Sequence, residues 1–305
     1  MWRTCFWRYA SSLAWKGNMK TYLDCIPCFL NQTLEAVRMV SNDKDIHEIL
    51  LKKVMRYLCE INSFNNSPPE ISREVHAIIR KELDCKDPYK EVKKKSNEMA
   101  NKLYSKLRKM IEEADDMLLT ATKLAIVGNV IDFGSVNRFD VREMIEKAIR
   151  ENIDENAYSL FKERVKKAHI ILYIADNAGE IFFDKLLLEL LIKMNKKIIY
   201  AVKKNPIIND ATMEDAKLAG INALTKVIIA DDSNLSAPGI LLHRTSPRFL
   251  KYFENADMII AKGQGNYESM SNSRKEIFFL LVVKCPLVAR NIGEKVGKFV
   301  IKVNK

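Results

Sequence analysis

Acidic and amide side chains follow two apolar runs in the second half of this 305-residue chain. Asp176 and Asn177 come directly after the run at residues 170–175, and the loop after the run at residues 197–202 ends in Asp210. Carboxylate and amide oxygens are the ligands that Mg²⁺ and Mn²⁺ prefer, and neither loop contains a histidine or cysteine of the kind that binds zinc. These residue types predict a site for a divalent cation.

Each loop also admits a structural interpretation. Asn177, with Glu180 three residues later, has the form of a helix capping pair. Asp210 could equally cap a helix expected over residues 211–219. Neither loop alone decides between capping and metal binding, so the decision depends on what the other loops carry.

Groups suited to an anion follow two later apolar runs. Residues 262–268, which read Lys-Gly-Gln-Gly-Asn-Tyr-Glu, follow the run at residues 258–261, and Lys284 follows the run at residues 277–283. Glycines let backbone N–H groups approach phosphate oxygens closely, and a lysine neutralises phosphate charge. A divalent ion bridged to a phosphate accounts for acids, amides, glycines and lysines after successive strands. The loop is not a dinucleotide-binding fingerprint, because the third glycine is missing.

A further amide and acid lie between two glycines earlier in the chain. Asn129 and Asp132 belong to the stretch at residues 128–134, which reads Gly-Asn-Val-Ile-Asp-Phe-Gly. The same stretch could simply be a helix terminus and a turn.

The spacing of apolar residues changes along the chain. Between residues 24 and 152 they recur at helical spacing, whereas from residue 169 onward short β-rich runs alternate with helical patterns. This alternation predicts an α/β fold, with a largely parallel, Rossmann-like sheet and flanking helices, beside an all-helical N-terminal domain. We assign residues 19–152 to the helical domain and residues 153–305 to the α/β domain that binds metal and phosphate. The expected strands span residues 170–175, 197–202, 227–230, 258–261, 277–283 and 299–303.

Charge, hydropathy and cysteine content indicate which partners and which location to expect. The net charge of +11 comes from lysines spread over the chain without an arginine-rich aromatic stripe, so we expect no nucleic-acid partner. No apolar stretch has the length of a membrane span, so we expect no membrane partner. Six cysteines are too few for a disulfide scaffold, which favours a reducing compartment and a cytoplasmic location. Residues 1–18 hold all three tryptophans and are interpreted as an extension foreign to the rest.

Six short motifs occur in order along the chain: Cys25-Ile-Pro-Cys28, Gly128-Asn-Val-Ile-Asp132, Asp176-Asn-Ala-Gly-Glu180, Asn209-Asp-Ala-Thr212, Gly263-Gln-Gly-Asn-Tyr-Glu268 and Lys284-Cys-Pro286. Taken together, they resemble the damage-control phosphatase family, formerly a family of unknown function. The likeness covers residues 19–305 and is closest to the archaeal and bacterial single-domain branch. It implies a metal-dependent phosphatase that acts on small phosphorylated metabolites, often damaged or surplus ones.

The resemblance also implies a role for each matching residue. Asp176, Asn177 and Asp210 would bind the ion, which could be Mn²⁺, Mg²⁺, Co²⁺ or Ni²⁺. Asp176, Asn177 and Lys284 would be the catalytic residues, with Lys284 contacting phosphate. Either metal-activated water or Asp176 itself would attack. Substrate-binding residues would be Asn129, Asp132, Glu180, Gly263, Gly265, Asn266 and Tyr267.

Two other functions fit a doubly wound sheet. A carboxyl methyltransferase that uses S-adenosylmethionine would need a glycine-rich loop after the first strand, where this chain has only Gly179. A non-catalytic protein that binds phosphorylated metabolites would use the same pocket without turnover.

The Cys25/Cys28 pair lacks a second pair to complete a zinc site, so we expect buried structural thiols. The oligomeric state and the physiological substrate stay open.

Overall fold

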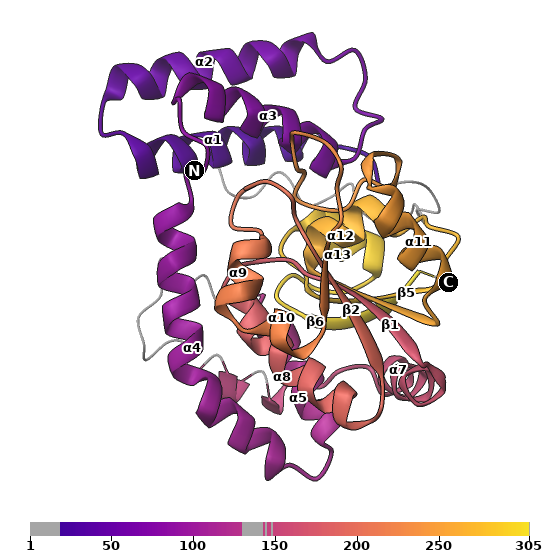
Figure 1. Ribbon diagram of the computed structural model, residues 1–305. Coiled ribbons are helices and arrows are strands. Elements are labelled where there is room, and N and C mark those ends of the chain that lie inside the picture. Colours follow the sequence, from indigo (N-terminus) through magenta and orange to yellow (C-terminus); the bar gives the residue numbers. More distant parts are fainter. Residues whose placement is uncertain (1–18, 130–142, 144, 148, 305) are drawn as a thin grey trace, which may run out of the picture.

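A six-stranded sheet forms the centre of the computed structural model, which describes residues 19–129, 143, 145–147 and 149–304 (Figure 1). The strand order is β3-β2-β1-β4-β5-β6, with β1 to β5 parallel and β6 antiparallel to β5. This architecture confirms the predicted α/β fold class. The strands are β1 (Ile170–Ile174), β2 (Lys197–Val202), β3 (Lys226–Ile229), β4 (Met258–Lys262), β5 (Ile277–Val282) and β6 (Phe299–Val303).

The strand order reverses in the middle of the sheet. From β1 the chain passes through α8 (Glu180–Lys193) to β2 on one side, whereas β4, which pairs with the other side of β1, leads to β5. Ligands of doubly wound sheets bind at such a reversal, beyond the carboxyl ends of the strands. Asp176 and Gly263, which follow β1 and β4, therefore flank the expected crevice.

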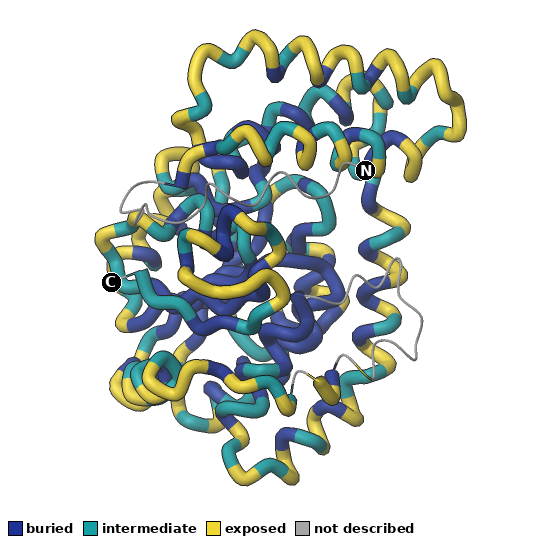
Figure 2. The backbone as a smooth tube through the Cα atoms, turned by 180° about the vertical axis from the view of Figure 1, so that it is seen from behind, coloured by how far each residue is buried: buried dark blue, intermediate teal, exposed yellow. Residues whose placement is uncertain are grey.

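Both faces of the sheet are covered by helices, and Figure 2 shows the buried core that results. Residues of β1 alternate between the faces because side chains of a strand alternate. Ile171 and Tyr173 join an apolar cluster with α5, α7 and α8, whereas Leu172 and Ile174 join one with α11, α12 and α13. These helices are α5 (Met117–Val127), α7 (Glu155–Lys167), α11 (Pro247–Asn255), α12 (Gly263–Met270) and α13 (Pro286–Ile292).

The first three helices pack around an apolar cluster of their own. They are α1 (Cys25–Val40), α2 (Lys44–Glu60) and α3 (Pro68–Glu82), and their cluster includes Phe29, Val54 and Val75. A capping box between Ser67 and Glu70 begins α3. Because α3 contacts α12, this helical cluster lies at the edge of the sheet where β4 ends.

The next helix, α4 (Lys90–Glu112), links the helical cluster to the sheet layers and packs against α8 (Figure 1). Residues of α4 and α5 belong to the same apolar cluster as β1 and β2. The proposed domain boundary after residue 152 stays a prediction. Shorter elements are α9 (Met213–Leu218), α10 (Ile221–Leu224) and a 3₁₀ helix (Leu242–Arg244).

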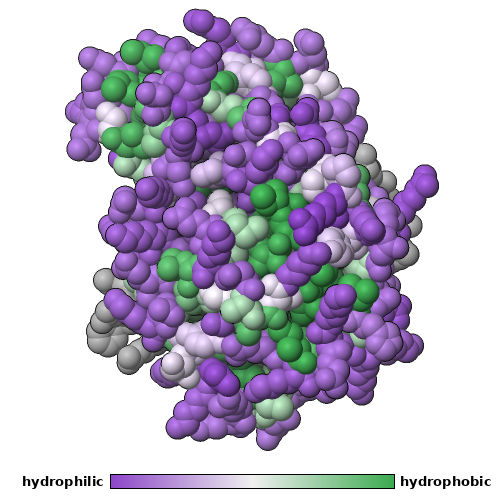
Figure 3. Space-filling view, in the orientation of Figure 1, coloured by the Kyte–Doolittle hydropathy of each residue, from purple (hydrophilic) through white to green (hydrophobic). Residues whose placement is uncertain are grey.

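No helix in the described part of the chain is both long and apolar enough to cross a membrane. Hydrophilic side chains dominate the face seen in Figure 3, and hydrophobic ones gather in a band across its centre. Residues 1–18 and Asp132, which figured in the sequence-based predictions, lie outside the described residues.

A fully buried lysine joins the end of β4 to α8. Lys262 Nζ donates hydrogen bonds to Glu180 Oε1 and Asp184 Oδ1, both at 2.6 Å, and to the carbonyl oxygen of Ala125 at 2.7 Å. These contacts use all three donors of the ammonium group. The side chains of Lys262, Glu180 and Asp184 have no exposed surface, so water does not screen the ion pairs.

Replacing Lys262 by methionine should lower the free energy of unfolding by about 3–5 kcal/mol, because it leaves two buried carboxylates without their cation. Chemical denaturation followed by circular dichroism measures this change. Lys167→Met is the matched control, since Lys167 pairs with Glu163 on the surface and should matter little. A Lys262→Met protein as stable as the control would contradict the stabilising role of Lys262.

Candidate active site

The loops that follow β1 and β2 are joined to each other by backbone hydrogen bonds. The N–H of Ala211 donates to the carbonyl oxygen of Asp176 at 2.7 Å, and the N–H of Ala178 donates to that of Asn209 at 2.8 Å. A further bridge pairs Asn177 with Asp210. The first and second crossovers therefore hold the two acids and the amide at one place, as the carboxyl ends of adjacent parallel strands require.

Helix capping does not account for Asn177 or Asp210. The residue that caps α8 is Gly179, and the capping box of α9 is formed by Thr212 and Asp215. Glu180 does accept a hydrogen bond from the N–H of Asn177 at 3.3 Å, so part of the expected capping pair exists. Both predicted ligands are nevertheless left without a capping role.

Two asparagine amides hold Asp176 against Glu180. Asn129 Nδ2 donates to Asp176 Oδ2 at 2.6 Å and to Glu180 Oε2 at 2.9 Å. Asn177 Nδ2 donates to the same two oxygens at 2.8 and 3.0 Å. Since Glu180 Oε1 binds Lys262, a continuous chain of polar contacts runs from the core of the sheet to Asp176.

Three buried polar atoms beside this network have no hydrogen-bond partner among the described residues: Asn129 Oδ1, Asp210 Oδ2 and Lys203 Nζ. Lys203 Nζ lies 3.6 Å from Asp210 Oδ2, which is an ion-pair distance without a hydrogen bond. Buried polar groups are almost always paired, so unpaired oxygens next to a buried carboxylate indicate a missing partner. Two acceptor oxygens of this kind fit a hard divalent cation.

Burial also disfavours the ionised forms of Asp176 and Asp210. Loss of hydration, with help from the charge of Glu180, raises the pKa of Asp176 to about 6, although Lys284 and Lys203 oppose the shift. Burial raises the pKa of Asp210 well above its usual value, and Lys203 offsets part of this rise. A cation between the two acids would favour their charged forms.

Gly263 lets the start of α12 approach Asp176 closely. A Cβ atom at this position would lie 1.9 Å from Asp176 Oδ2, and its φ of +79° also favours glycine. A Cβ atom at Gly265 would lie 1.9 Å from the carbonyl oxygen of Pro238. The first N–H groups of a helix lack partners within the helix, so the start of α12 suits an anion beside Asp176.

Lys284 lies at the rim of the site. Its side chain is exposed, and its backbone N–H donates to Gln264 Oε1 at 2.9 Å, which ties the end of β5 to α12. Its charge acts on Asp176, where it lowers the pKa. An exposed ammonium group at this place can reach an incoming anion.

The side chains of Asn266 and Tyr267 form hydrogen bonds to other parts of the fold. Asn266 Nδ2 donates to the carbonyl oxygens of Ala175 and Lys262, and its Oδ1 accepts from the N–H of Ile240. The Tyr267 hydroxyl donates to Asn291 Oδ1 at 2.5 Å, toward α13. Their assignment to substrate binding stays a prediction.

Two charged residues near the site were given no role in the sequence-based predictions. Lys203 follows β2 directly and contacts Asp210, and its place after a strand was the available signal. Glu268 closes the glycine-rich motif, and burial raises its pKa to about 7. Among the described residues no three His, Cys, Asp or Glu side chains gather around one point, so any ion here would depend on amide oxygens as well.

Comparison with known proteins assigns the family. Residues 21–300 match the damage-control phosphatase ARMT1-like domain. A damage-control phosphatase of Pyrococcus horikoshii is 38% identical over 291 residues, 94% of this chain and 99% of that protein. One from Archaeoglobus fulgidus is 34% identical over 282 residues, 92% of this chain and 97% of that protein.

A solved structure agrees with these sequence relatives. The crystal structure of a DUF89 family protein from Pyrococcus horikoshii matches with a TM-score of 0.85 and 38% identity, covering 94% of this chain and 100% of that one. The chain therefore belongs to the damage-control phosphatase family, which confirms the resemblance drawn from its motifs.

Gly263→Ala should reduce phosphate release by about 100-fold or more, because the added Cβ displaces Asp176 and small misplacements at a reacting centre are costly. Steady-state kinetics with p-nitrophenyl phosphate measures this loss. Gly293→Ala is the matched control: its φ is +85°, yet no described atom lies within 4 Å of the added Cβ. Equal losses in both variants would show that backbone strain, and not the collision with Asp176, is responsible.

Proposed function

We propose that this protein is a divalent-metal-dependent phosphatase that hydrolyses phosphate esters of small metabolites where β1, β2, β4 and β5 end. The observation that carries the proposal is the pair of buried carboxylates, Asp176 and Asp210, on hydrogen-bonded loops with an unpaired oxygen beside them. Membership of the damage-control phosphatase family supports the reaction class.

Asp176, Asn177 and Asp210 would hold the ion, with Asn129 Oδ1 as a further oxygen within the same network. When bound, the ion would supply charge neutralisation and polarise a phosphoryl oxygen. Both asparagine amides engage Asp176 Oδ2, which leaves Oδ1 for the ion or for attack on phosphorus. Mn²⁺, Mg²⁺, Co²⁺ and Ni²⁺ all accept this donor set.

The remaining residues position the phosphate. The N–H groups at the start of α12 bind its oxygens, and Gly263 allows them to do so beside Asp176. Lys284 neutralises charge that grows as the bond to the leaving alcohol breaks. Phosphoryl transfer needs mainly such positioning and charge compensation, so these groups suffice with either water or Asp176 as the attacking group.

Purified protein, first treated with a chelator, should release phosphate from p-nitrophenyl phosphate only after Mn²⁺, Co²⁺, Ni²⁺ or Mg²⁺ is added. Asp210→Asn should lower kcat/KM by about 100-fold or more, because a charge that holds the ion is lost. Asp232→Asn, at an exposed acid after β3, is the matched control and should retain activity. Methyl transfer without phosphate release would favour a methyltransferase, and binding without turnover a sensor.

Lys284→Ala should lower kcat by about 10-fold to 100-fold, because Lys284 compensates charge that develops in the transition state. Mn²⁺ affinity, measured by calorimetry, should stay within about twofold, since Lys284 is not an ion ligand. Lys295→Ala, at an exposed lysine of the next loop, should change neither quantity. Equal losses of turnover and of metal affinity in Lys284→Ala would rule out this role.

A further inference from the structure

A cavity of about 210 Å³ lies between the helical cluster and the edge of the sheet. Its walls come from α1, α3, α12, α13 and the loop that ends in Asp210. Phe29 and Ser72 line it from the helical side, and Ile208, Gln264 and Glu268 line it from the α/β side.

The cavity adjoins the candidate active site. Gln264 directly follows Gly263, and Cys285 directly follows Lys284, so two walls continue the loops that position phosphate. Gln264 Nε2 also contacts Cys285 Sγ at 3.5 Å, which joins these walls. Glu268, on the cavity wall, also interacts through its charge with Asp176 and Lys284, so a phosphate held at the start of α12 would lie close to this cavity.

Most of the cavity wall is apolar and uncharged. Phe29, Ile208 and Leu287 contribute hydrocarbon surface. Burial raises the pKa of the Cys25 thiol to about 11, and it also raises that of Cys28, so both thiols are neutral near pH 7. The wall suits a compact organic group more than a second phosphate.

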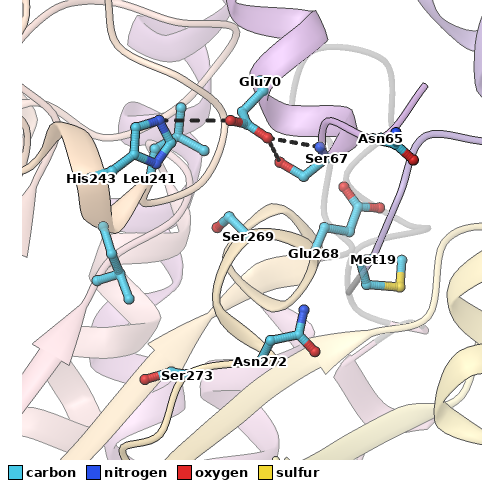
Figure 4. A pocket seen from close by; sticks show the side chains of 11 residues that line it. Met19, Asn65, Ser67, Glu70, Leu241, His243, Glu268, Ser269, Asn272 and Ser273 are labelled. Carbon is cyan, nitrogen blue, oxygen red and sulfur yellow. Dashed lines mark hydrogen bonds and ion pairs between the residues drawn. The ribbon is translucent and has the colours of Figure 1, made fainter. Parts of the chain in front are cut away.

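Two acids are among the described residues that line the cavity, and Glu268 is the less exposed of the two. The other lining acid, Asp24, is exposed at the rim and lies 3.7 Å from Arg290. Glu268 Oε1 accepts a hydrogen bond from Gln264 Nε2 at 2.8 Å, which fixes the carboxyl on the cavity wall. The side chain also borders a second cavity of about 260 Å³, where Glu70 lies across from it (Figure 4).

The surroundings of Glu268 delay the ionisation of its side chain until the pH is above neutral. Burial raises its pKa to about 7, the charge of Asp176 acts in the same direction, and Lys284 and the contact with Gln264 oppose the rise. The other titratable groups that line the two cavities with it are Asp24, Cys25, Cys28, Cys285, Glu70 and His243. At pH 8 the interior therefore carries one fixed negative charge close to the reaction centre.

We propose that this cavity receives the leaving group of the phosphate ester and that Glu268 selects uncharged or cationic leaving groups over anionic ones. The inference rests on the proposed phosphatase function. A carboxylate on the cavity wall accepts a hydrogen bond from a hydroxyl or ammonium group and repels a second anion. The preferred substrates are thus monophosphates of compact alcohols that carry no further negative charge.

The effect of leaving-group charge can be separated from that of shape with two substrates of similar size. They are glycerol phosphate and phosphoglycerate, which carries an additional carboxylate. At pH 8 with Mn²⁺, the unmodified protein should prefer glycerol phosphate by about tenfold or more in kcat/KM, the scale of one like-charge contact across a partly hydrated cavity. Glu268→Gln should narrow this ratio by at least about fivefold, mainly through a lower KM for phosphoglycerate. Glu254→Gln, at an exposed acid of α11, should keep the original ratio.

A second variant tests the same idea in the opposite direction. Gln32 lines the cavity from α1 and is partly exposed, so Gln32→Glu adds a negative charge and should widen the preference for glycerol phosphate. Hydrolysis of both substrates with a ratio that neither variant changes would overturn the leaving-group assignment and leave the phosphatase function intact. Failure of the unmodified protein to hydrolyse either substrate, or p-nitrophenyl phosphate, with every metal would instead reject the proposed function itself.

Discussion

The rest of this structure depends on two carboxylates that are held close together and away from water. Asp176 and Asp210 lie on loops that are hydrogen-bonded to each other, and burial raises the pKa of both. Without a cation this arrangement opposes folding, because desolvated like charges repel. Proteins retain such unfavourable groups mainly at functional sites, where a ligand offsets the repulsion.

The core of the sheet holds the site in place through one chain of contacts. Lys262, at the end of β4, fixes Glu180, and Glu180 orients the amides that hold Asp176. Gly263 then lets the start of α12 come within reach of the same carboxylate. The hydrophobic packing of β4 and α8 thereby fixes the position of the Asp176 carboxylate oxygens. A rigid scaffold preorganises a reacting centre in this way.

The fold, and the meeting of the loops that follow β1 and β2, could be predicted from the sequence, because buried parallel strands read as apolar runs and the polar loops after them must share one edge of the sheet. The partners of Lys262 and Lys203 could not, since they depend on how α8 and the β2 loop pack in three dimensions. The same holds for Asn266, because its motif does not reveal the three backbone groups of the fold that its amide contacts. The position of a residue after a strand predicts which edge of the sheet it lies at. Its side-chain contacts depend on how the helices and loops pack.

The most direct test of the shared cation is thermal unfolding of Asp176→Asn and of the unmodified protein at pH 7.5, in chelator and with Mn²⁺. In chelator the variant should be more stable by about 1–3 kcal/mol, because an ionised carboxyl whose pKa is raised to about 6 weakens the folded state above that pH. Added Mn²⁺ should raise the Tm of the unmodified protein and leave that of the variant unchanged. A variant that is less stable in chelator, and that gains as much from Mn²⁺ as the unmodified protein does, would contradict the claim that Asp176 and Asp210 share one ion.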